Sequence, residues 1–184
     1  MPLTITGIAG SLRRDSYSQA VLRGLAAELP SGTLYRPLDI GLLPHYNQDF
    51  DGAASPDTVT SARAQVAASD AVLIVTPEFN HGLPGVLKNA LDWLSRPAFT
   101  GCFVGKPVLF ASIGTHGLGG VRAQHQLRET LSAMLCRMAP LKELVVPMVA
   151  EKLQDGALFD APTRAHLAQA LESFLAEFSM PRAA

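Results

Sequence analysis

Short apolar runs alternate along the chain with longer stretches in which apolar residues recur at helical spacing. The most hydrophobic short run, residues 71–76, is apolar on both faces, which is typical of a central parallel strand covered by helices on both sides. We expect Ser55 to cap a helix that has Pro56 in its first turn, after a long loop over residues 39–56. In full, the pattern predicts strands over residues 3–9, 33–38, 71–76, 107–113 and 144–147, and helices over 18–29, 56–68, 85–95, 121–138 and 163–178.

This alternation of five strands and five helices predicts one α/β domain over residues 1–184, because no linker, repeat or low-complexity stretch interrupts it. We expect a doubly wound parallel sheet with right-handed crossovers and helices on both faces. Ligands of such sheets bind beyond the carboxyl ends of the strands, where the strand order reverses. The loops after the first, third and fourth strands are therefore the segments to inspect for chemistry.

Composition narrows the possible partners. The chain has 184 residues, 48% hydrophobic and 17% charged, and its 15 basic and 16 acidic residues give a net charge of −1. No field of one sign is available to bind nucleic acid or an acidic membrane surface. Cys102 and Cys136 lack metal-ligand spacing, and the histidines are dispersed, so no metal site is expected. Without a basic leader or an apolar run of about 20 residues, the sequence predicts a soluble cytoplasmic protein with no membrane contact.

The loop after the first strand is rich in hydrogen-bond donors and leads directly into a helix. The donors are Ser11, Arg13, Ser16 and Ser18. A helix N-terminus offers unpaired N–H groups and the positive end of the helix dipole, and a guanidinium pairs with phosphate in a fork. The pattern favours a compact phosphate site, with neither a GxxxxGK[ST] nor a GxGxxG motif. The alternative is that Ser16 or Ser18 only caps the helix and the arginines are solvated.

The loop after the third strand combines prolines, glycines and one aromatic ring. Its first residues are Pro77, Glu78, Phe79, Asn80 and His81. Exposed backbone groups beside an aromatic face suit a flat heteroaromatic ligand. The alternatives are core packing for Phe79 and a plain surface position for His81. After the fourth strand, Gly114 begins a glycine-rich loop whose backbone can approach a ligand or another subunit closely.

Three segments together resemble the NADPH-dependent FMN reductase family, which includes quinone, azo and chromate reductases. They are residues 10–16 (GSLRRDS), residues 76–93 (TPEFNHGLPGVLKNALDW) and residues 105–108 (GKPV) running into the glycine pair at 119–120. The resemblance implies a flavodoxin-like fold with strand order 2-1-3-4-5. It also implies that members form homodimers or homotetramers, with the helix over residues 88–93 near the subunit interface.

The resemblance implies a role for each loop. Ser11, Arg13, Ser16 and Ser18 would bind the FMN phosphate. Pro77, Glu78, Phe79, Asn80 and His81 would line the isoalloxazine ring, largely through backbone atoms, and Gly114 would approach it from the loop after the fourth strand. The family often has tyrosine where Phe79 stands, so this chain keeps the ring and lacks the hydroxyl.

The expected activity is that of an NAD(P)H-dependent, FMN-containing oxidoreductase. Hydride would pass from NADPH or NADH to bound FMN, and electrons would then pass to a quinone, an azo compound, a flavin or a metal oxyanion such as chromate. A ping-pong order follows if donor and acceptor use the same pocket, and no catalytic side chain is then required. Two alternatives stay open: a flavodoxin-like electron carrier without NAD(P)H oxidase activity, and a flavin-free α/β interaction domain.

Overall fold

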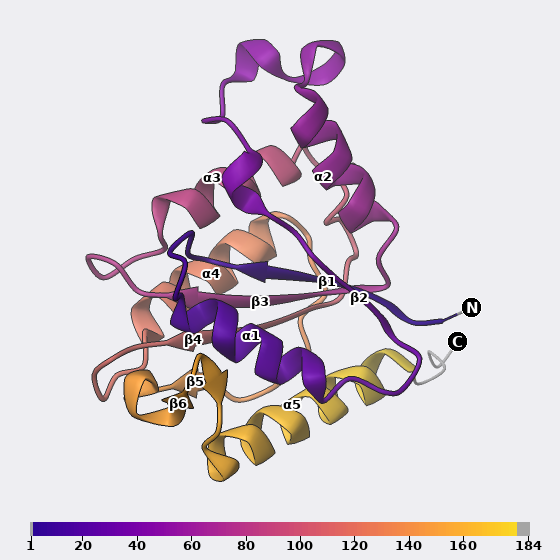
Figure 1. The fold of residues 1–184 in the computed structure, drawn as a ribbon. Helices are drawn as coiled ribbons and strands as arrows, with labels where there is room; N and C mark the ends of the chain where they lie inside the picture. The colour runs from indigo at the N-terminus through magenta and orange to yellow at the C-terminus, as the bar shows by residue number, and fades with distance from the viewer. Residues whose placement is uncertain (1, 180–184) are drawn as a thin grey trace.

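The computed structural model describes residues 2–179, which form a five-stranded parallel sheet enclosed by α-helices (Figure 1). The strand order is β2-β1-β3-β4-β5, and each neighbouring pair runs parallel. This is the order of flavodoxin-like folds, so the predicted topology is confirmed. The strands are β1 (Thr4–Ala9), β2 (Leu34–Pro37), β3 (Ala71–Pro77), β4 (Val108–Ile113) and β5 (Val145–Val146). The helices are α1 (Tyr17–Ala27), α2 (Asp57–Ala67), α3 (Gly85–Leu94), α4 (Val121–Ala133) and α5 (Ala161–Ser179).

Two hydrophobic clusters lie on opposite faces of the sheet, and β3 contributes to both. Val72 and Ile74 pack with α2, α3 and α4, whereas Leu73 and Val75 pack with α1 and α5. All four side chains are completely buried. Burial of this strand on both faces confirms the interpretation of residues 71–76 as a central parallel strand.

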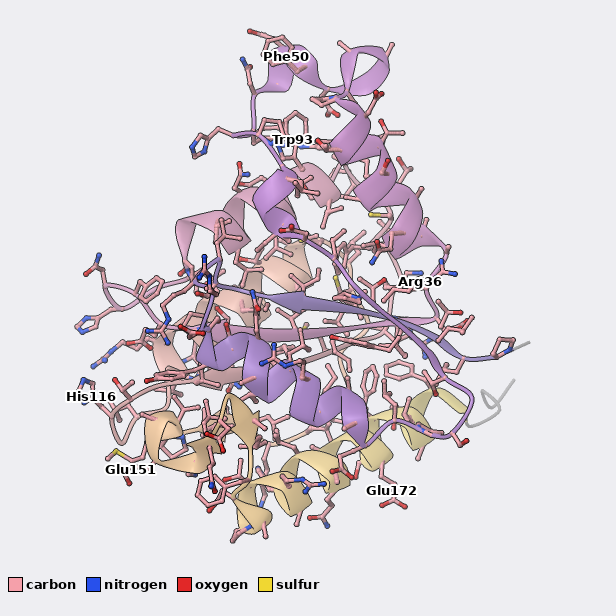
Figure 2. The ribbon with its side chains drawn as sticks, viewed as in Figure 1. Arg36, Phe50, Trp93, His116, Glu151 and Glu172 are labelled. Carbon is pink, nitrogen blue, oxygen red and sulfur yellow. The ribbon has the colours of Figure 1, made fainter. Side chains whose placement is uncertain are left out.

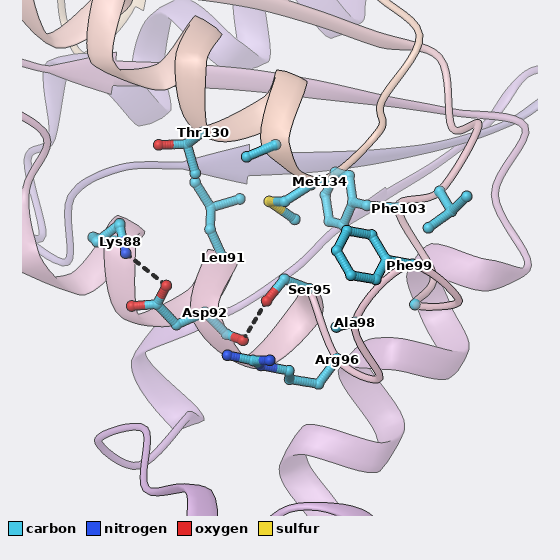
Figure 3. A pocket seen from close by; sticks show the side chains of 13 residues that line it. Lys88, Leu91, Asp92, Ser95, Arg96, Ala98, Phe99, Phe103, Thr130 and Met134 are labelled. Carbon is cyan, nitrogen blue, oxygen red and sulfur yellow. Dashed lines mark hydrogen bonds and ion pairs between the residues drawn. The ribbon is translucent and has the colours of Figure 1, made fainter.

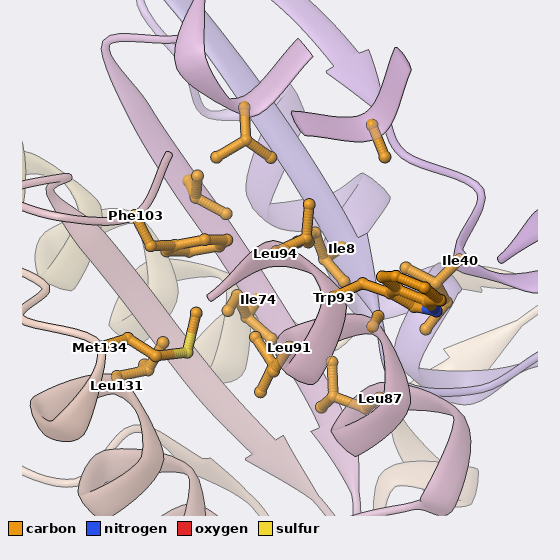
Figure 4. Close-up of a cluster of buried hydrophobic side chains, with 14 of the residues drawn as sticks. Ile8, Ile40, Ile74, Leu87, Leu91, Trp93, Leu94, Phe103, Leu131 and Met134 are labelled. Atoms are coloured by element: carbon orange, nitrogen blue, oxygen red, sulfur yellow. The ribbon is translucent and has the colours of Figure 1, made fainter. Parts of the chain in front are cut away.

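Trp93 on α3 anchors the segment between β2 and α2 to the first of these clusters (Figure 4). The indole is fully buried, and its Nε1 donates to the carbonyl oxygen of Pro44 at 2.8 Å. Asn89, one turn earlier, donates to the same carbonyl at 2.9 Å and accepts from the Tyr46 N–H at 2.7 Å. These contacts pair the Pro44 carbonyl and the Tyr46 N–H and so fix the middle of the predicted loop over residues 39–56 against α3. The loop contains three short 3₁₀ turns, Ile40–Leu42, Gln48–Phe50 and Gly52–Ala54.

Some element boundaries differ from the sequence prediction, each for a local reason. α2 begins at Asp57 with Pro56 at the N-cap position, so the expected Ser55 cap was wrong. The Ser55 hydroxyl instead accepts a hydrogen bond from the Arg63 guanidinium at 3.0 Å. α4 ends at Ala133 instead of residue 138, because Leu135 adopts a left-handed φ of 57°.

A small two-stranded antiparallel hairpin was not predicted. It pairs β6 (Leu153–Gln154) with β7 (Ala157–Leu158). The turn is Asp155-Gly156, with φ angles of 51° and 74°, and an Asp-Gly pair is a known signal for a two-residue hairpin loop. The hairpin packs on α1, where Leu158 lies against Gly24.

The two cysteines are free thiols in half-buried positions. Burial raises the pKa of Cys102 to about 11 and the pKa of Cys136 to about 12. Thiols with such pKa values are protonated near neutral pH, which makes them poor nucleophiles and poor metal ligands. Among residues 2–179, no three His, Cys, Asp or Glu side chains gather as a metal site.

Candidate functional site

A cavity of about 210 Å³ lies at the carboxyl ends of β1, β3 and β4. Three segments far apart in the sequence meet around it: the loop leading into α1, the turn after β3 and the loop after β4. The lining residues are Ser11, Arg13, Ser16, Tyr17, Ser18, Pro77, Glu78, Phe79, Ile113, Gly114, Thr115 and Val149. The strand order places the cavity where α1 and α3 leave the sheet on opposite faces, which is the general position of ligands in such folds.

The N-terminus of α1 forms one side of the cavity. Ser16 is the N-cap, and its hydroxyl accepts from the Gln19 N–H at 3.3 Å. The Ser16 and Ser18 hydroxyl oxygens are 2.8 Å apart, and both side chains are buried. Ser16 therefore caps the helix, as one alternative proposed, and also lines the cavity. The free N–H groups of the first helical turn give this side a positive potential.

Arg13 is the cation of this loop. Its guanidinium donates to the Asp15 carbonyl oxygen at 2.5 Å and lies 4.6 Å from the centroid of the Tyr17 ring. The side chain is exposed, so these contacts leave part of its donor fork open to a ligand. Ser11 supports the loop, because its hydroxyl accepts from the Arg13 N–H at 3.3 Å. Hydroxyls, N–H groups and a guanidinium thus converge at one end of the cavity.

The turn after β3 forms the opposite side. Phe79 and Gly82 exchange two backbone hydrogen bonds of 3.1 and 3.0 Å. Asn80 and His81 lie between them with φ angles of 49° and 64°, an arrangement typical of a tight two-residue hairpin turn. Phe79 keeps 57% of its surface exposed. Its ring is therefore not core, and it offers the cavity an aromatic face.

Gly114 brings the backbone of the β4–α4 loop to the cavity. Its N–H donates to the Val146 carbonyl oxygen at 3.1 Å, and its own carbonyl accepts from the Val149 N–H at 2.9 Å. A Cβ atom at Gly114 would lie 3.1 Å from the Cα of Gly119, so the loop folds tightly on itself. Figure 2 shows His116, from the outer part of this loop, at the same end of the sheet.

The structure brings together every predicted site residue except Asn80 and His81. Those two occupy the exposed tip of the turn and do not line the cavity. Sequence reasoning missed Tyr17, Ile113, Thr115 and Val149. Tyr17 and Thr115 lie inside loops that were already singled out, and Ile113 is the last residue of β4. Val149 follows β5 and carries no local signal. Its place depends on the hydrogen bond to Gly114.

A flavodoxin-like sheet whose cavity combines hydroxyl, N–H and guanidinium donors with an exposed aromatic ring has the features of a mononucleotide-binding protein. Comparison with known proteins identifies the class more closely. The family model described as NADPH-dependent FMN reductase matches residues 3–151. A quinone reductase of Pseudomonas putida strain KT2440 is 34% identical over 180 residues, 98% of this chain and 97% of that protein.

A 2-hydroxy-1,4-benzoquinone reductase of a Burkholderia species is 34% identical over 177 residues, which are 96% of each chain. The solved structure of FerB, a flavoenzyme NAD(P)H:(acceptor) oxidoreductase from Paracoccus denitrificans, has a TM-score of 0.86 at 31% identity, covering 95% of this chain and 96% of that one. The chain belongs to the NADPH-dependent FMN reductase family. It is therefore an oxidoreductase that uses FMN as cofactor and NAD(P)H as co-substrate.

Because the β4–α4 loop is tightly folded, we expect a side chain at Gly120 to destabilise the protein. This residue has φ 79°, and a Cβ atom would lie 2.6 Å from the Ile113 carbonyl oxygen. We expect Gly120→Ala to lower the free energy of unfolding by about 1–2 kcal/mol from the left-handed backbone alone. Gly117→Ala is the matched control in the same loop, because nothing lies within 4 Å of its Cβ position. Urea unfolding of the flavin-free protein measures the free energy of unfolding of both variants, and equal values would contradict the expected strain at Gly120.

Proposed function

We propose that this chain is an NAD(P)H-dependent quinone reductase in which electron donor and acceptor use one pocket in turn. The observation that carries the proposal is the meeting, in one cavity, of a helix N-terminus rich in hydrogen-bond donors and the exposed Phe79 ring. A short phosphate grip beside a planar slot fits a mononucleotide better than a dinucleotide. Relatives named quinone reductase support a small planar acceptor.

The residues of the cavity fit FMN in type and in arrangement. Ser11, Arg13, Ser16 and Ser18 would hold the phosphate, since they provide hydroxyls and a guanidinium at a helix N-terminus. Residues 77–81 and Gly114 would line the ring through backbone groups, with Phe79 offering an apolar face. Among these, Asn80 and His81 would act from the rim, because they lie at the tip of the turn.

When bound, FMN would supply the redox chemistry, a net transfer of two electrons from NAD(P)H to the acceptor; a quinone would leave as the hydroquinone, with one hydrogen supplied by the hydride and one proton taken from water. The protein positions the two substrates, and no side chain of the cavity need move a proton for this scheme. A reduced flavin gives electrons to acceptors of many kinds, and an open pocket discriminates poorly among them. Azo compounds, free flavins and oxyanions such as chromate are therefore further acceptors within the proposal.

Stopped-flow absorbance tests the proposal directly. We expect NADPH or NADH to bleach the visible absorption of the bound flavin. In steady-state kinetics with a quinone, we expect double-reciprocal plots to be parallel lines, because oxidised nicotinamide leaves before the quinone enters. Intersecting plots would contradict the shared pocket.

Two other outcomes would favour the alternative functions. A flavin that stays coloured would favour the electron carrier, although a net charge of −1 provides little field for steering toward a protein partner. A colourless protein that binds no added FMN would favour the interaction domain.

Replacement of Arg13 tests the phosphate site. We expect Arg13→Ala to weaken FMN binding by about 1–3 kcal/mol, the range for a hydrogen bond to a charged group. Arg14→Ala is the matched control, because Arg14 is exposed and does not line the cavity. Fluorescence titration of FMN measures both affinities. An unchanged affinity for Arg13→Ala would show that the guanidinium is only solvated.

We also propose that the chain forms homodimers or homotetramers through the surface of α3 and α4. A cavity of about 320 Å³ opens there (Figure 3) and includes Leu91, Phe103 and Met134 in its lining. Phe99 beside it is 74% exposed and Val104 is 40% exposed, and exposed apolar residues around a hollow are typical of subunit contacts. We expect Phe99→Asp to lower the mass measured by light scattering. A wild-type monomer would contradict the proposal.

The location of the protein remains a separate proposal. We propose the cytoplasm, because Cys102 and Cys136 are both free and a reducing compartment keeps thiols in that state. None of the helices within residues 2–179 has the length and apolar character needed to cross a membrane. Cell fractionation tests the location, and recovery outside the cytoplasmic fraction would contradict it.

A further inference from the structure

The flavin-lining turn is attached to α4 by the carboxylate of Glu78. Gly120, the N-cap residue of α4, has no side chain with which to cap the helix. Glu78 supplies the cap from 44 residues away: its Oε2 accepts from the N–H groups of Arg122 at 2.9 Å and Ala123 at 3.2 Å. The Arg122 guanidinium lies 3.6 Å from the other carboxylate oxygen. The Glu78 side chain is only 15% exposed, whereas that of Arg122 is 48% exposed.

A second contact joins the next turn of the same helix to the loop, but here the loop donates the hydrogen bond and the helix side chain accepts it. The side-chain Oε1 of Gln126 on α4 accepts from the N–H of Leu83 at 2.7 Å. The same oxygen lies 2.9 Å from the Cβ position of Gly82, so a side chain there would push it away. Gln126 and Arg122 are four residues apart and share one face of the helix. The two contacts therefore hold both ends of the turn against one side of α4.

We propose that Gln126 is a positioning residue which, together with Glu78, clamps the turn over residues 78–83 to α4 and thereby fixes the backbone that lines the flavin pocket. The inference rests on the proposed function, because it assigns the clamp a role in holding FMN. Gln126 does not line the cavity and would act only through the turn. No catalytic role is implied.

The turn needs such a clamp because its own contacts fix its shape and not its orientation. The two hydrogen bonds between Phe79 and Gly82 close the turn, and Asn80 and His81 at its tip are exposed. Phe79 is also more than half exposed, so apolar packing is confined to the Leu83 end of the turn, where that side chain packs on the core cluster. Without Gln126 the Leu83 N–H loses its acceptor, and only the packing of the Leu83 side chain would hold that end. Backbone groups that must meet the edge of a flat ring are effective only when their positions are preorganised.

Two substitutions of Gln126 separate the acceptor from the bulk of the side chain. Gln126→Met keeps the length and removes the oxygen, whereas Gln126→Glu keeps an oxygen and can pair with Arg122 four residues earlier. We expect the dissociation constant of FMN to rise about three- to tenfold in Gln126→Met, the equivalent of one hydrogen bond. It should stay within about twofold of wild type in Gln126→Glu. Gln126 is exposed, so neither variant disturbs the core.

Gln169→Met on α5 is the matched control. Gln169 is also an exposed helical glutamine, and its backbone carbonyl accepts from Ser173 just as that of Gln126 accepts from Thr130. The expected FMN affinity of this variant is that of wild type. Fluorescence quenching measures the affinities, and hydrogen exchange of the Leu83 amide in the flavin-free protein measures the clamp itself. We expect that amide to lose protection in Gln126→Met and to retain it in Gln126→Glu.

The outcomes distinguish the clamp from the function on which it rests. Equal FMN affinities in Gln126→Met and wild type would overturn the positioning role while leaving the proposed function intact. So would an equal loss of affinity in the Met and Glu variants, because the acceptor oxygen that the Glu variant retains would then not be what positions the turn. An unprotected Leu83 amide in the wild-type protein would overturn the clamp itself. A wild-type chain that binds no FMN would overturn the proposed function and the role of Gln126 together.

Discussion

The candidate site depends on one packing constraint, the burial of β3 between helices on both faces of the sheet. Val72 and Ile74 require cover from α2, α3 and α4, and Leu73 and Val75 require cover from α1 and α5. The chain must therefore leave β1 toward one face and β3 toward the other. Loops that diverge in this way leave a space at the strand ends that the protein itself does not fill. The hydrophobic effect that stabilises the sheet thus also creates the cavity.

The chemistry of the cavity divides along its length. At the α1 end, the Ser16 and Ser18 hydroxyls and the Arg13 guanidinium favour an anion. At the other end, the walls are the Phe79 ring and backbone, and Gly114 is packed so tightly against Gly119 that a side chain has little room there. Different ends of the cavity would therefore bind a cofactor phosphate and contact a planar ring. This separation would allow the proposed shared pocket to hold its cofactor at one end and to admit substrates at the other.

Hydrophobic periodicity predicted the central elements, because it reports burial directly, whereas the strand order came from the family resemblance. Sequence patterns failed where the deciding hydrogen bonds have no signature in residue type. The C-terminus of α4 closes with hydrogen bonds from Leu135 to Ser132 and from Cys136 to Leu131, a motif that usually has glycine where Leu135 stands. The order of residues 39–56 depends on Trp93 and Asn89, which lie more than one helix away along the chain. Neither feature has a signature in its own segment.

The same limit applies to the site. The cavity lining within the phosphate-type loop and at the start of the β3–α3 turn could be predicted, because each loop is contiguous, whereas Asn80 and His81 lie outside that lining. Val149 and Gln126 could not, since each acts through one hydrogen bond to a distant loop. Gln126 also connects the flavin pocket to the proposed subunit surface. Thr130, whose hydroxyl donates to the Gln126 carbonyl at 2.8 Å, lines the cavity of Figure 3 one turn further along α4. α4 therefore contacts the turn that would face the cofactor and also forms part of the surface that would meet a second copy of the chain.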